Sequence, residues 1–298
     1  MDMNYLKELE SEAIYILREV WENFENPCIL YSGGKDSTVV AHIAKKAFHP
    51  AKMPFKLLHI DTGHNFPETL DFINDFVQEN EYELLTGSVQ ELIDNGTVVE
   101  EKDRYASRNS LQSKTLIETI HRLKIDCAIG GGRRDEEKSR AKERIFSLRD
   151  QSGVWRPYDQ RPELWDIFNS YHRQKEHFRV FPISNWTELD VWNYIREEKI
   201  ELPSLYFAHQ REMVWRDGTW VSQSDFLIPN ENEKVILKNI RFRTLGDITI
   251  TGGMESEAIT VDEIILEVAA TKISERGSRF DDKRSATAME DRKKEGYF

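Results

Sequence analysis

One stretch near the beginning of this sequence constrains its fold more than any other. A short apolar run ends in Gly33 and Gly34, and a hydroxyl-rich turn and the largely apolar segment 38–44 follow. This order predicts a strand, a tight loop and the start of a helix. The two glycines let the backbone approach an anion closely, and the helix directs unpaired N–H groups and its positive dipole end at the same point. The stretch therefore predicts a phosphate-binding loop.

The side chains of this loop support the same prediction. Ser32, Ser37 and Thr38 supply hydroxyl groups, and Lys35 supplies a positive charge. The loop is not a Walker A motif, because four variable residues do not separate its glycines and no Gly-Lys-Ser/Thr triplet closes it. The order Ser-Gly-Gly-Lys-Asp-Ser at 32–37 instead resembles the PP-loop of ATP pyrophosphatases, which split ATP between its α- and β-phosphates. The alternative is a glycine-rich turn that only connects two elements.

Composition sets broad limits on the chain. Its 298 residues suffice for one large α/β domain, or for a domain with an extension. Cys28 and Cys127 lie in apolar, strand-like runs, which indicates buried packing residues rather than a disulfide framework or a metal cluster. The net charge of −12 argues against a general nucleic-acid binder. The sequence has no signal-like start after Met1 and no long apolar span, so we expect a soluble, cytoplasmic protein.

Apolar runs alternate with helical patterns through the first two thirds of the chain. Residues 6–24 have helical periodicity, and strand-like runs follow the phosphate loop at 55–60, 82–86, 126–129 and 178–183. The alternation predicts an α/β fold with a doubly wound, mostly parallel sheet. Such a sheet brings the loops at the carboxyl ends of three strands onto one rim, where open α/β sheets bind ligands.

Asp61 is the charged residue at the end of the second predicted strand. Its position is suited to meeting a hydroxyl group or Mg²⁺. The loop 62–69 behind it could equally be an ordinary helix-capping loop, in which Pro67 starts the next helix.

The predicted strand 126–129 runs into three glycines, residues 130–132, and then into a charged segment. From Arg133 to Arg149, seven Lys or Arg stand against four Asp or Glu. In an acidic protein this local excess can attract anions. We assign function to Arg133 and Arg134, and we interpret the later charges as a solvated helix with ion pairs along it.

The remaining third of the chain has a different pattern. Residues 155–173 are aromatic and irregular, which is typical of a lid, a binding loop or an interface. Asp217-Gly218 between two apolar runs predicts a hairpin, and a loop with paired glycines is expected at 249–253. We divide the chain into an ATP-binding α/β domain, residues 1–203, and a carboxyl-terminal extension, residues 204–298. The tail from Ser274 has too few apolar residues to fold alone and could order over a nucleotide or a partner chain.

Several motifs together resemble one known family. Residues 32–37 and 59–69 resemble the branch of the PP-loop superfamily that contains adenylyl-sulfate and phosphoadenylyl-sulfate reductases. Further stretches resemble the small, ATP-binding subunits of bacterial heterodimeric sulfate adenylyltransferases, namely residues 131–138, 144–147, 160–165, 242–246, 255–258 and 289–298. The resemblance covers nearly the whole chain and implies a fold of the adenine nucleotide alpha hydrolase-like type. One departure is Asp247, where the resemblance leads us to expect a cysteine.

The resemblance also implies a reaction and a set of site residues. It implies that a sulfate oxygen attacks the α-phosphorus of ATP, giving adenylyl sulfate and pyrophosphate. It implies Mg²⁺ with the ATP, for which Asp36 or Asp61 is the candidate ligand. The implied catalytic residues are Lys35, Asp36, Arg133 and Arg134. The implied ATP-binding residues are Ser32, Gly33, Gly34, Lys35, Asp36, Ser37, Asp61 and Gly131.

A partner protein is implied as well. The resemblance points to a larger GTPase subunit of the translation-factor type, which forms a heterodimer or higher complex and drives the unfavourable reaction by GTP hydrolysis. This sequence contains no Walker A motif, so such a GTPase must be a separate polypeptide. The aromatic segment 155–165 and the hairpin at Asp217-Gly218 are the candidate interface, and we expect neither a nucleic-acid nor a membrane partner.

Three other functions can be weighed against this one. Reductases of the same superfamily use a cysteine near the carboxyl terminus as nucleophile, but no cysteine follows Cys127. A regulatory or scaffold subunit without chemistry would need the same glycines for binding alone. A tRNA-modifying PP-loop enzyme is disfavoured by the acidic balance and by the absence of Cys-x-x-Cys pairs.

Overall fold

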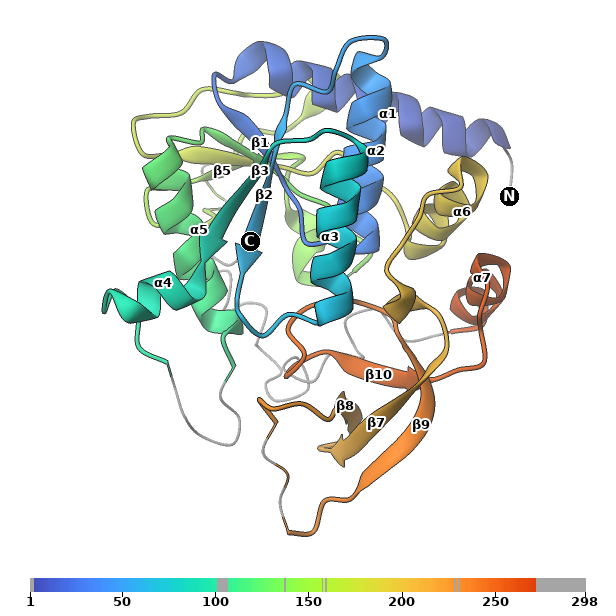
Figure 1. Cartoon of the computed structure of the whole chain (residues 1–298). Helices are drawn as coiled ribbons and strands as arrows, with labels where there is room; N and C mark the ends of the chain where they lie inside the picture. The colour runs from blue at the N-terminus through green and yellow to red at the C-terminus, as the bar shows by residue number, and fades with distance from the viewer. Residues whose placement is uncertain are drawn as a thin grey trace.

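A six-stranded sheet forms the centre of the protein, in a computed structural model that describes residues 3–100, 107–136, 138–156, 158, 160–227, 229 and 231–271 (Figure 1). The strands have the order β3-β2-β1-β4-β6-β5. Their bounds are β1 Pro27–Leu30, β2 Lys56–Asp61, β3 Leu84–Ser88, β4 Cys127–Ile129, β5 Phe146–Arg149 and β6 His177–Val180. The first five in spatial order run parallel, and β5 is antiparallel to β6 at the edge. The predicted doubly wound, mostly parallel sheet is therefore confirmed.

The strand order reverses direction at β1. From there the chain builds outward through β2 and β3 on one side, and through β4 and β6 on the other. In open α/β sheets such a reversal leaves a crevice outside the carboxyl ends of the strands, because the connections on its two sides lead to opposite faces of the sheet. The phosphate loop follows β1 directly, so the predicted anion site lies at this crevice.

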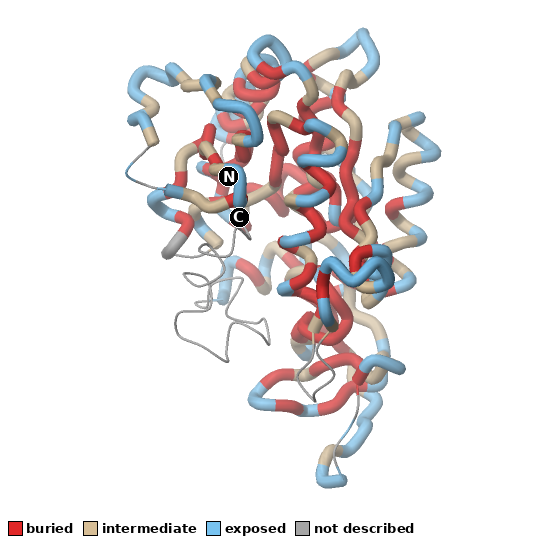
Figure 2. Tube along the Cα trace, turned by 90° about the vertical axis from the view of Figure 1, so that its left-hand side faces the viewer, coloured by how far each residue is buried: buried red, intermediate tan, exposed pale blue. Residues whose placement is uncertain are grey.

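Helices cover both faces of the sheet (Figure 1). On one face, Ile29 and Ile129 pack in a core with α1 (Met3–Asn23), α2 (Lys35–Phe48), α3 (Pro67–Glu79) and α6 (Glu188–Glu198). On the other face, Cys28 and Ala128 pack with α4 (Val89–Asp94) and α5 (Asn109–Leu123). Neighbouring residues of one strand therefore belong to different cores, as the two-residue repeat of a strand requires. Figure 2 shows the resulting run of buried residues through the centre of the molecule.

The segment after β4 differs from the solvated helix that its charges suggest. It contains the short 3₁₀ helix η1 (Lys138–Lys142) and then the edge strand β5, which the sequence reading missed. Arg140 and Arg149 are buried rather than solvated. The strand has only four residues, Phe146–Arg149, and follows directly on a run of charged residues, so its apolar pattern was not recognised and this part of the prediction was wrong.

The predicted hairpin belongs to a small closed barrel with the strand order β10-β8-β7-β9. The strands are β7 His209–Arg216, β8 Thr219–Ser222, β9 Val235–Phe242 and β10 Gly252–Glu255. Asp217 and Gly218 both have positive φ, 46° and 79°, as a two-residue hairpin turn requires. The expected loop at 249–253 is wrong in part, because Gly252 and Gly253 lie within β10. A Cβ on Gly253 would come within 2.9 Å of Met213 Cε, so the glycine lets β10 close the barrel.

Helix α7 (Val261–Ala270) and the 3₁₀ helices η3 (Leu164–Asp166) and η4 (Ser204–Tyr206) complete the elements that frame the site. Helix α7 packs on α6, and a buried pair between Glu188 and Arg243 joins α6 to the end of β9. The division at residues 203 and 204 falls just before η4 and stays a prediction. The tail from Ser274 lies outside the described residues. None of the helices in the described ranges is long and apolar enough to cross a bilayer.

Candidate functional site

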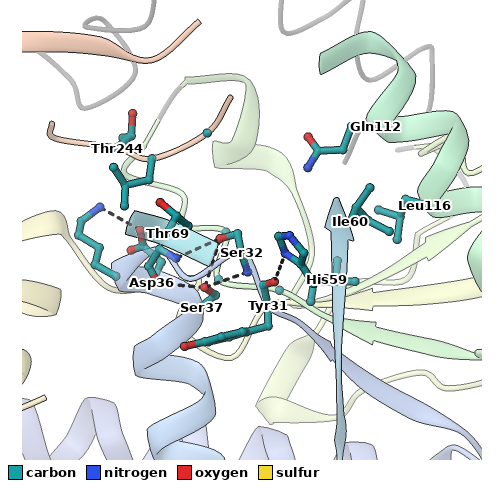
Figure 3. Close-up of a pocket in the computed structure, with 18 of the residues that line it drawn as sticks. Tyr31, Ser32, Asp36, Ser37, His59, Ile60, Thr69, Gln112, Leu116 and Thr244 are labelled. Atoms are coloured by element: carbon teal, nitrogen blue, oxygen red, sulfur yellow. Dashed lines mark hydrogen bonds and ion pairs between the residues drawn. The ribbon is translucent and has the colours of Figure 1, made fainter. Parts of the chain in front are cut away.

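A cavity of about 290 Å³ opens at the strand reversal, among the described residues. The segments after β1, β2 and β4 contribute to it, together with α5 and the loop after β9. Figure 3 shows two distinct ends, with Ser32, Ser37 and Asp36 on one side and Gln112 and Leu116 on the other. The predicted meeting of three strand-end loops at one rim is therefore confirmed.

The backbone of the phosphate loop requires its first glycine. Gly33 has a φ of 70°, in the left-handed region that side chains disfavour. A Cβ at this position would also lie 2.8 Å from Ile73 Cγ1 on α3. Gly34 is the N-cap of α2 and has no side chain to cap the helix, so amides that follow Lys35 in the first helical turn can face a ligand.

Hydroxyl groups fix the shape of the loop. Ser37 Oγ and Thr38 Oγ1 both donate to the Gly34 carbonyl oxygen at 2.9 Å. The Oγ atoms of Ser32 and Ser37 lie 3.3 Å apart at the cavity wall. Thr38 is fully buried beneath the loop, where it braces the loop and does not line the cavity. Two of the three predicted hydroxyl groups therefore reach the cavity.

Lys35, Asp36 and Arg133 form one ion-pair chain. Lys35 Nζ lies 2.9 Å from Asp36 Oδ2, and Arg133 Nε donates to Asp36 Oδ1 at 2.8 Å. Burial by itself raises the pKa of Asp36, but Lys35 and Arg133 outweigh this effect and lower it to about 2. Asp36 is therefore a carboxylate at every physiological pH, and it holds the Lys35 ammonium at the loop. Arg133 is fully buried behind Asp36 and does not line the cavity.

Gly131 brings the loop after β4 against the phosphate loop. A Cβ on Gly131 would come within 2.9 Å of the Asp36 carbonyl carbon and of Asp36 Cβ. The glycine therefore allows two chain segments from neighbouring strands to touch and to share the cavity wall, and its contact with a nucleotide stays a prediction.

Arg134 and Asp61 lie outside the cavity lining. Arg134 Nε and Nη2 donate to the Glu143 carbonyl oxygen at 3.3 and 3.1 Å, and Nη1 donates to Asn185 Oδ1. Asp61 Oδ1 accepts a 2.7 Å hydrogen bond from the Gly63 amide. Asp61 therefore makes the kind of loop-capping contact that was the alternative for residues 62–69, whereas Arg134, to which we assigned function, contacts the backbone at Glu143 and the side chain of Asn185.

Asp247, the departure from the family pattern, has a defined place. Thr62 Oγ1 donates to Asp247 Oδ1 at 2.6 Å, and the Ile248 amide donates to the His64 carbonyl oxygen at 2.9 Å. Asp247 also lines the cavity. The carboxylate therefore ties the loop after β9 to the loop after β2, so the aspartate has a packing role where a cysteine was expected.

Several lining residues were missed in the sequence. Arg140 and Arg179 reach the cavity, although Arg140 was interpreted as solvated and Arg179 as part of an apolar strand. Tyr206 also lines it, and its hydroxyl accepts a 2.8 Å hydrogen bond from the Lys35 amide. For Arg179 the sequence offered one signal, a charged residue within an apolar strand. A buried charge needs a partner, so such a residue is a candidate for ligand binding.

The side chains that line the cavity fit a metal ion that is already bound to the phosphates of a nucleotide. No group of three or more His, Cys, Asp or Glu within the described ranges could hold a metal ion. Mg²⁺ usually keeps several waters and binds through one or two carboxylates together with substrate phosphates. The Asp36 oxygens already contact two cations, and Asp61 lies outside the lining. The residues therefore fit an Mg²⁺ ion held mainly by phosphate oxygens.

Comparisons with known proteins agree with this picture. The phosphoadenosine phosphosulfate reductase domain family matches residues 26–253. A sulfate adenylyltransferase subunit 2 from Mycolicibacterium vanbaalenii is 52% identical over 100% of this chain and 96% of that protein. The protein of the same name from Streptomyces lavendulae is 52% identical over 99% and 92%, respectively.

Solved structures show weaker likeness. A phosphoadenylyl-sulfate reductase from Candida auris, in a phosphate complex, has a TM-score of 0.45 and 17% identity, and covers 69% of this chain and 91% of that one. An NH3-dependent NAD synthetase from Campylobacter jejuni has a TM-score of 0.43 and 13% identity, and covers 67% and 75%. The fold assignment here depends on the strand order and not on these scores.

Proposed function

The chain belongs to the sulfate adenylyltransferase subunit 2 family, and from this premise we propose that it transfers the adenylyl group of ATP to sulfate. The observation that carries the proposal is the phosphate loop with Lys35 and Asp36 at a cavity on the strand reversal. Adenylyl sulfate and pyrophosphate would be the products, and the reaction would be the first step of sulfate activation and assimilation.

The phosphate loop would hold the departing pyrophosphate. Amides at the start of α2, the hydroxyls of Ser32 and Ser37 and the Lys35 ammonium surround one end of the cavity. These donors are in place before reaction, so they can stabilise charge that develops on the leaving group. Asp36 and Arg133 would act as positioning residues for Lys35, and Arg134 would hold the backbone behind them.

The other end of the cavity would hold the adenine. Leu58, Ile60 and Leu116 give this end an apolar wall between β2 and α5, and Gln112 adds a polar group (Figure 3). Binding sites for flat bases combine apolar walls with a few polar groups of this kind. A nucleotide bound in this direction would place its α-phosphate beside Gly131, between the two ends.

Sulfate is already an anion at neutral pH, so no general base is required. One sulfate oxygen would form a bond to the α-phosphorus while the bond to the bridging oxygen of the β-phosphate breaks. Positioning of the two substrates and neutralisation of their charges would account for the rate acceleration, since sulfate is a weak nucleophile. Mg²⁺ bound with ATP would supply further charge neutralisation on the phosphates, with Asp36 as a carboxylate of the phosphate loop that lines the cavity.

A GTPase partner would supply the driving force. The name "subunit 2" of the relatives indicates an enzyme with more than one subunit. Exposed side chains at the candidate interface support a contact there, among them Tyr158, Trp165 and Trp215. We place the larger GTPase subunit against these segments, in the cytoplasm.

A pyrophosphate-release assay tests the reaction. The chain with its partner subunit should release pyrophosphate from ATP when sulfate is added, and tRNA offered as an alternative acceptor should not replace sulfate. Lys35→Ala should abolish this release while thermal unfolding stays close to that of the wild type. Sulfate-independent release, or full activity in Lys35→Ala, would contradict the proposal.

The reductase alternative has no suitable nucleophile. Both cysteines of the sequence are buried, and burial raises the pKa of the Cys28 thiol to about 12. Burial raises the pKa of Cys127 as well. Nucleophilic cysteines need an accessible thiolate, so neither residue can perform that chemistry in this fold.

A further inference from the structure

Arg179 is a buried cation in the wall of the cavity. It lies on β6 between His177 and Val180, only 4% of its surface is exposed, and it lines the cavity. Among the residues that the structure describes, its Nε and Nη2 atoms have no hydrogen-bond partner. Burying donors of a charged group without partners is costly, so such a group is retained where a ligand completes its hydrogen bonds.

The surroundings of Arg179 increase this cost. Arg140 pairs with Glu136 at 3.1 Å, and Arg149 pairs with Glu143. Burial, together with the charge of Arg149, lowers the pKa of Arg179 to about 9, while Cys28 and Glu143 act in the opposite direction. Within the described part of the chain, Arg140 and Arg149 therefore each have a carboxylate partner, whereas Arg179 forms no ion pair.

Arg140 is held beside the same wall. A Cβ on Gly132 would overlap Arg140 Nη1, and both residues line the cavity with Arg179. The glycine therefore leaves room for a guanidinium at this point. Two arginines, one from β6 and one from η1, reach the cavity on the side of β6.

This wall lies two strands away from the phosphate loop. The loop follows β1, β4 is its neighbour, and β6 is the next strand. Two strand spacings amount to about 10 Å. The cavity therefore has cationic groups on two sides of Gly131, one set at the phosphate loop and one at Arg140 and Arg179.

We propose that Arg179, assisted by Arg140, binds the sulfate that attacks the α-phosphorus. This inference rests on the proposed function, because it assigns the second substrate to a wall of the same cavity. In an in-line displacement the attacking oxygen approaches from the side opposite the leaving group. Because pyrophosphate would occupy the phosphate loop, the nucleophile would approach from the side of β6. A guanidinium offers paired donors that match two oxygens of a tetrahedral dianion.

Arg179→Lys is the first test, measured in the complex with the partner subunit. Lysine keeps the charge but loses the planar pair of donors. We expect the KM for sulfate to rise about 10- to 100-fold, as for the loss of a hydrogen bond to a charged group. The KM for ATP should change less than about threefold. The matched control is Arg149→Lys, which lies on the same face of the sheet but does not line the cavity and pairs with Glu143. It should lower the melting temperature without a selective effect on sulfate.

The outcomes separate this inference from the proposed function. If the wild-type complex shows no sulfate-dependent pyrophosphate release, the proposed function fails, and the inference fails with it. If the wild type is active and Arg179→Lys raises the KM for ATP instead, Arg179 binds nucleotide and the inference alone is overturned. An unchanged KM for sulfate in a folded Arg179→Lys also overturns it.

A second variant keeps the test valid if Arg179→Lys does not fold. Arg140→Lys should raise the KM for sulfate in the same selective way. Equilibrium dialysis of labelled sulfate, with a non-hydrolysable ATP analogue present, gives a readout independent of turnover. Sulfate bound equally by the wild type and Arg140→Lys would contradict the assignment.

Discussion

Arg133 Nε donates a 2.8 Å hydrogen bond to Asp36 Oδ1, although the two residues are 97 positions apart in the sequence. The bond joins the loop after β4 to the first turn of α2. Because Asp36 also pairs with Lys35, a buried arginine that does not line the cavity controls the position of a lysine that does. The phosphate loop is therefore completed by a residue from outside its own motif.

Asp36→Asn should impair catalysis more than folding. The amide removes the charge that holds Lys35, so transition-state stabilisation by the lysine is lost, and we expect kcat to fall by about 100-fold or more. Steady-state pyrophosphate release at saturating ATP and sulfate measures the effect. Asp75→Asn, at an exposed position of α3, is the matched control. Similar kcat values for Asp36→Asn and the wild type would show that Lys35 needs no such partner.

Gly131→Ala and Gly130→Ala form a matched pair. The added methyl group would lie 2.9 Å from the Asp36 carbonyl carbon in Gly131→Ala, but 3.4 Å from Phe181 in Gly130→Ala, which is ordinary contact. We expect Gly131→Ala to lose about 10-fold or more in kcat/KM for ATP through displacement of the phosphate loop. Gly130→Ala should change it by less than about threefold. Equal losses would show that crowding against Asp36 is not the cause.

His177 should make the folded state sensitive to mild acid. Burial, reinforced by the charges of Arg179 and Arg149 and by His121 and His172, lowers the pKa of His177 well below its usual 6.5. The unfolded chain therefore takes up this proton near pH 6.5, before the folded chain does. Stability contributed by the neutral ring is complete above pH 6.5 and falls as the pH drops below it.

Urea unfolding at pH 7.5 and pH 5.5 measures this dependence. In His177→Phe, the loss of unfolding free energy between the two pH values should be smaller than in the wild type, because one proton-binding group has been removed. An identical loss in both proteins would show that His177 does not contribute.

The pair between Glu188 and Arg243 should be a strong link between α6 and the barrel. Arg243 Nε donates to both Glu188 oxygens, at 2.9 and 3.1 Å, and both side chains are buried. Removing one partner of a buried pair leaves a charge without compensation, so Glu188→Gln or Arg243→Met should each cost about 3–5 kcal/mol. The double variant should cost less than the two single costs together. Additive costs in denaturant unfolding would contradict direct coupling.

The sequence predicted the parts of the structure that depend on local pattern. The strand, glycine turn and helix start at residues 27–38, the alternating strands and helices and the turn at Asp217-Gly218 follow from glycine geometry and hydrophobic periodicity, and they were confirmed. The edge strand β5 was missed because it has only four residues and follows directly on a run of charged residues. Their partners come from the fold: Arg149, for example, is neutralised by Glu143 across a buried contact.

The placement of site residues was predicted less well than the fold. Arg133 and Arg134 are neighbours with the same charge, yet one supports the phosphate loop and the other caps the Glu143 carbonyl. Sequence alone cannot separate them, because the difference lies in which way the loop after β4 turns. Arg179 was not recognised as a site residue, because a single charged residue does not change the assignment of an apolar run as a strand.

Tyr206→Phe tests how far residues remote in sequence tune the phosphate loop. The Tyr206 hydroxyl accepts a 2.8 Å hydrogen bond from the Lys35 amide, at the first residue of α2. The variant removes this acceptor from a buried N–H group, so we expect a loss of about 1–3 kcal/mol in the free energy of unfolding. We also expect a rise of a few fold in the KM for ATP, because the first turn of α2 is no longer fixed from the η4 side. The KM for sulfate should stay within about twofold of the wild type. A variant with wild-type stability and wild-type ATP binding would show that the start of α2 is held by its own loop, and that η4 contributes only packing.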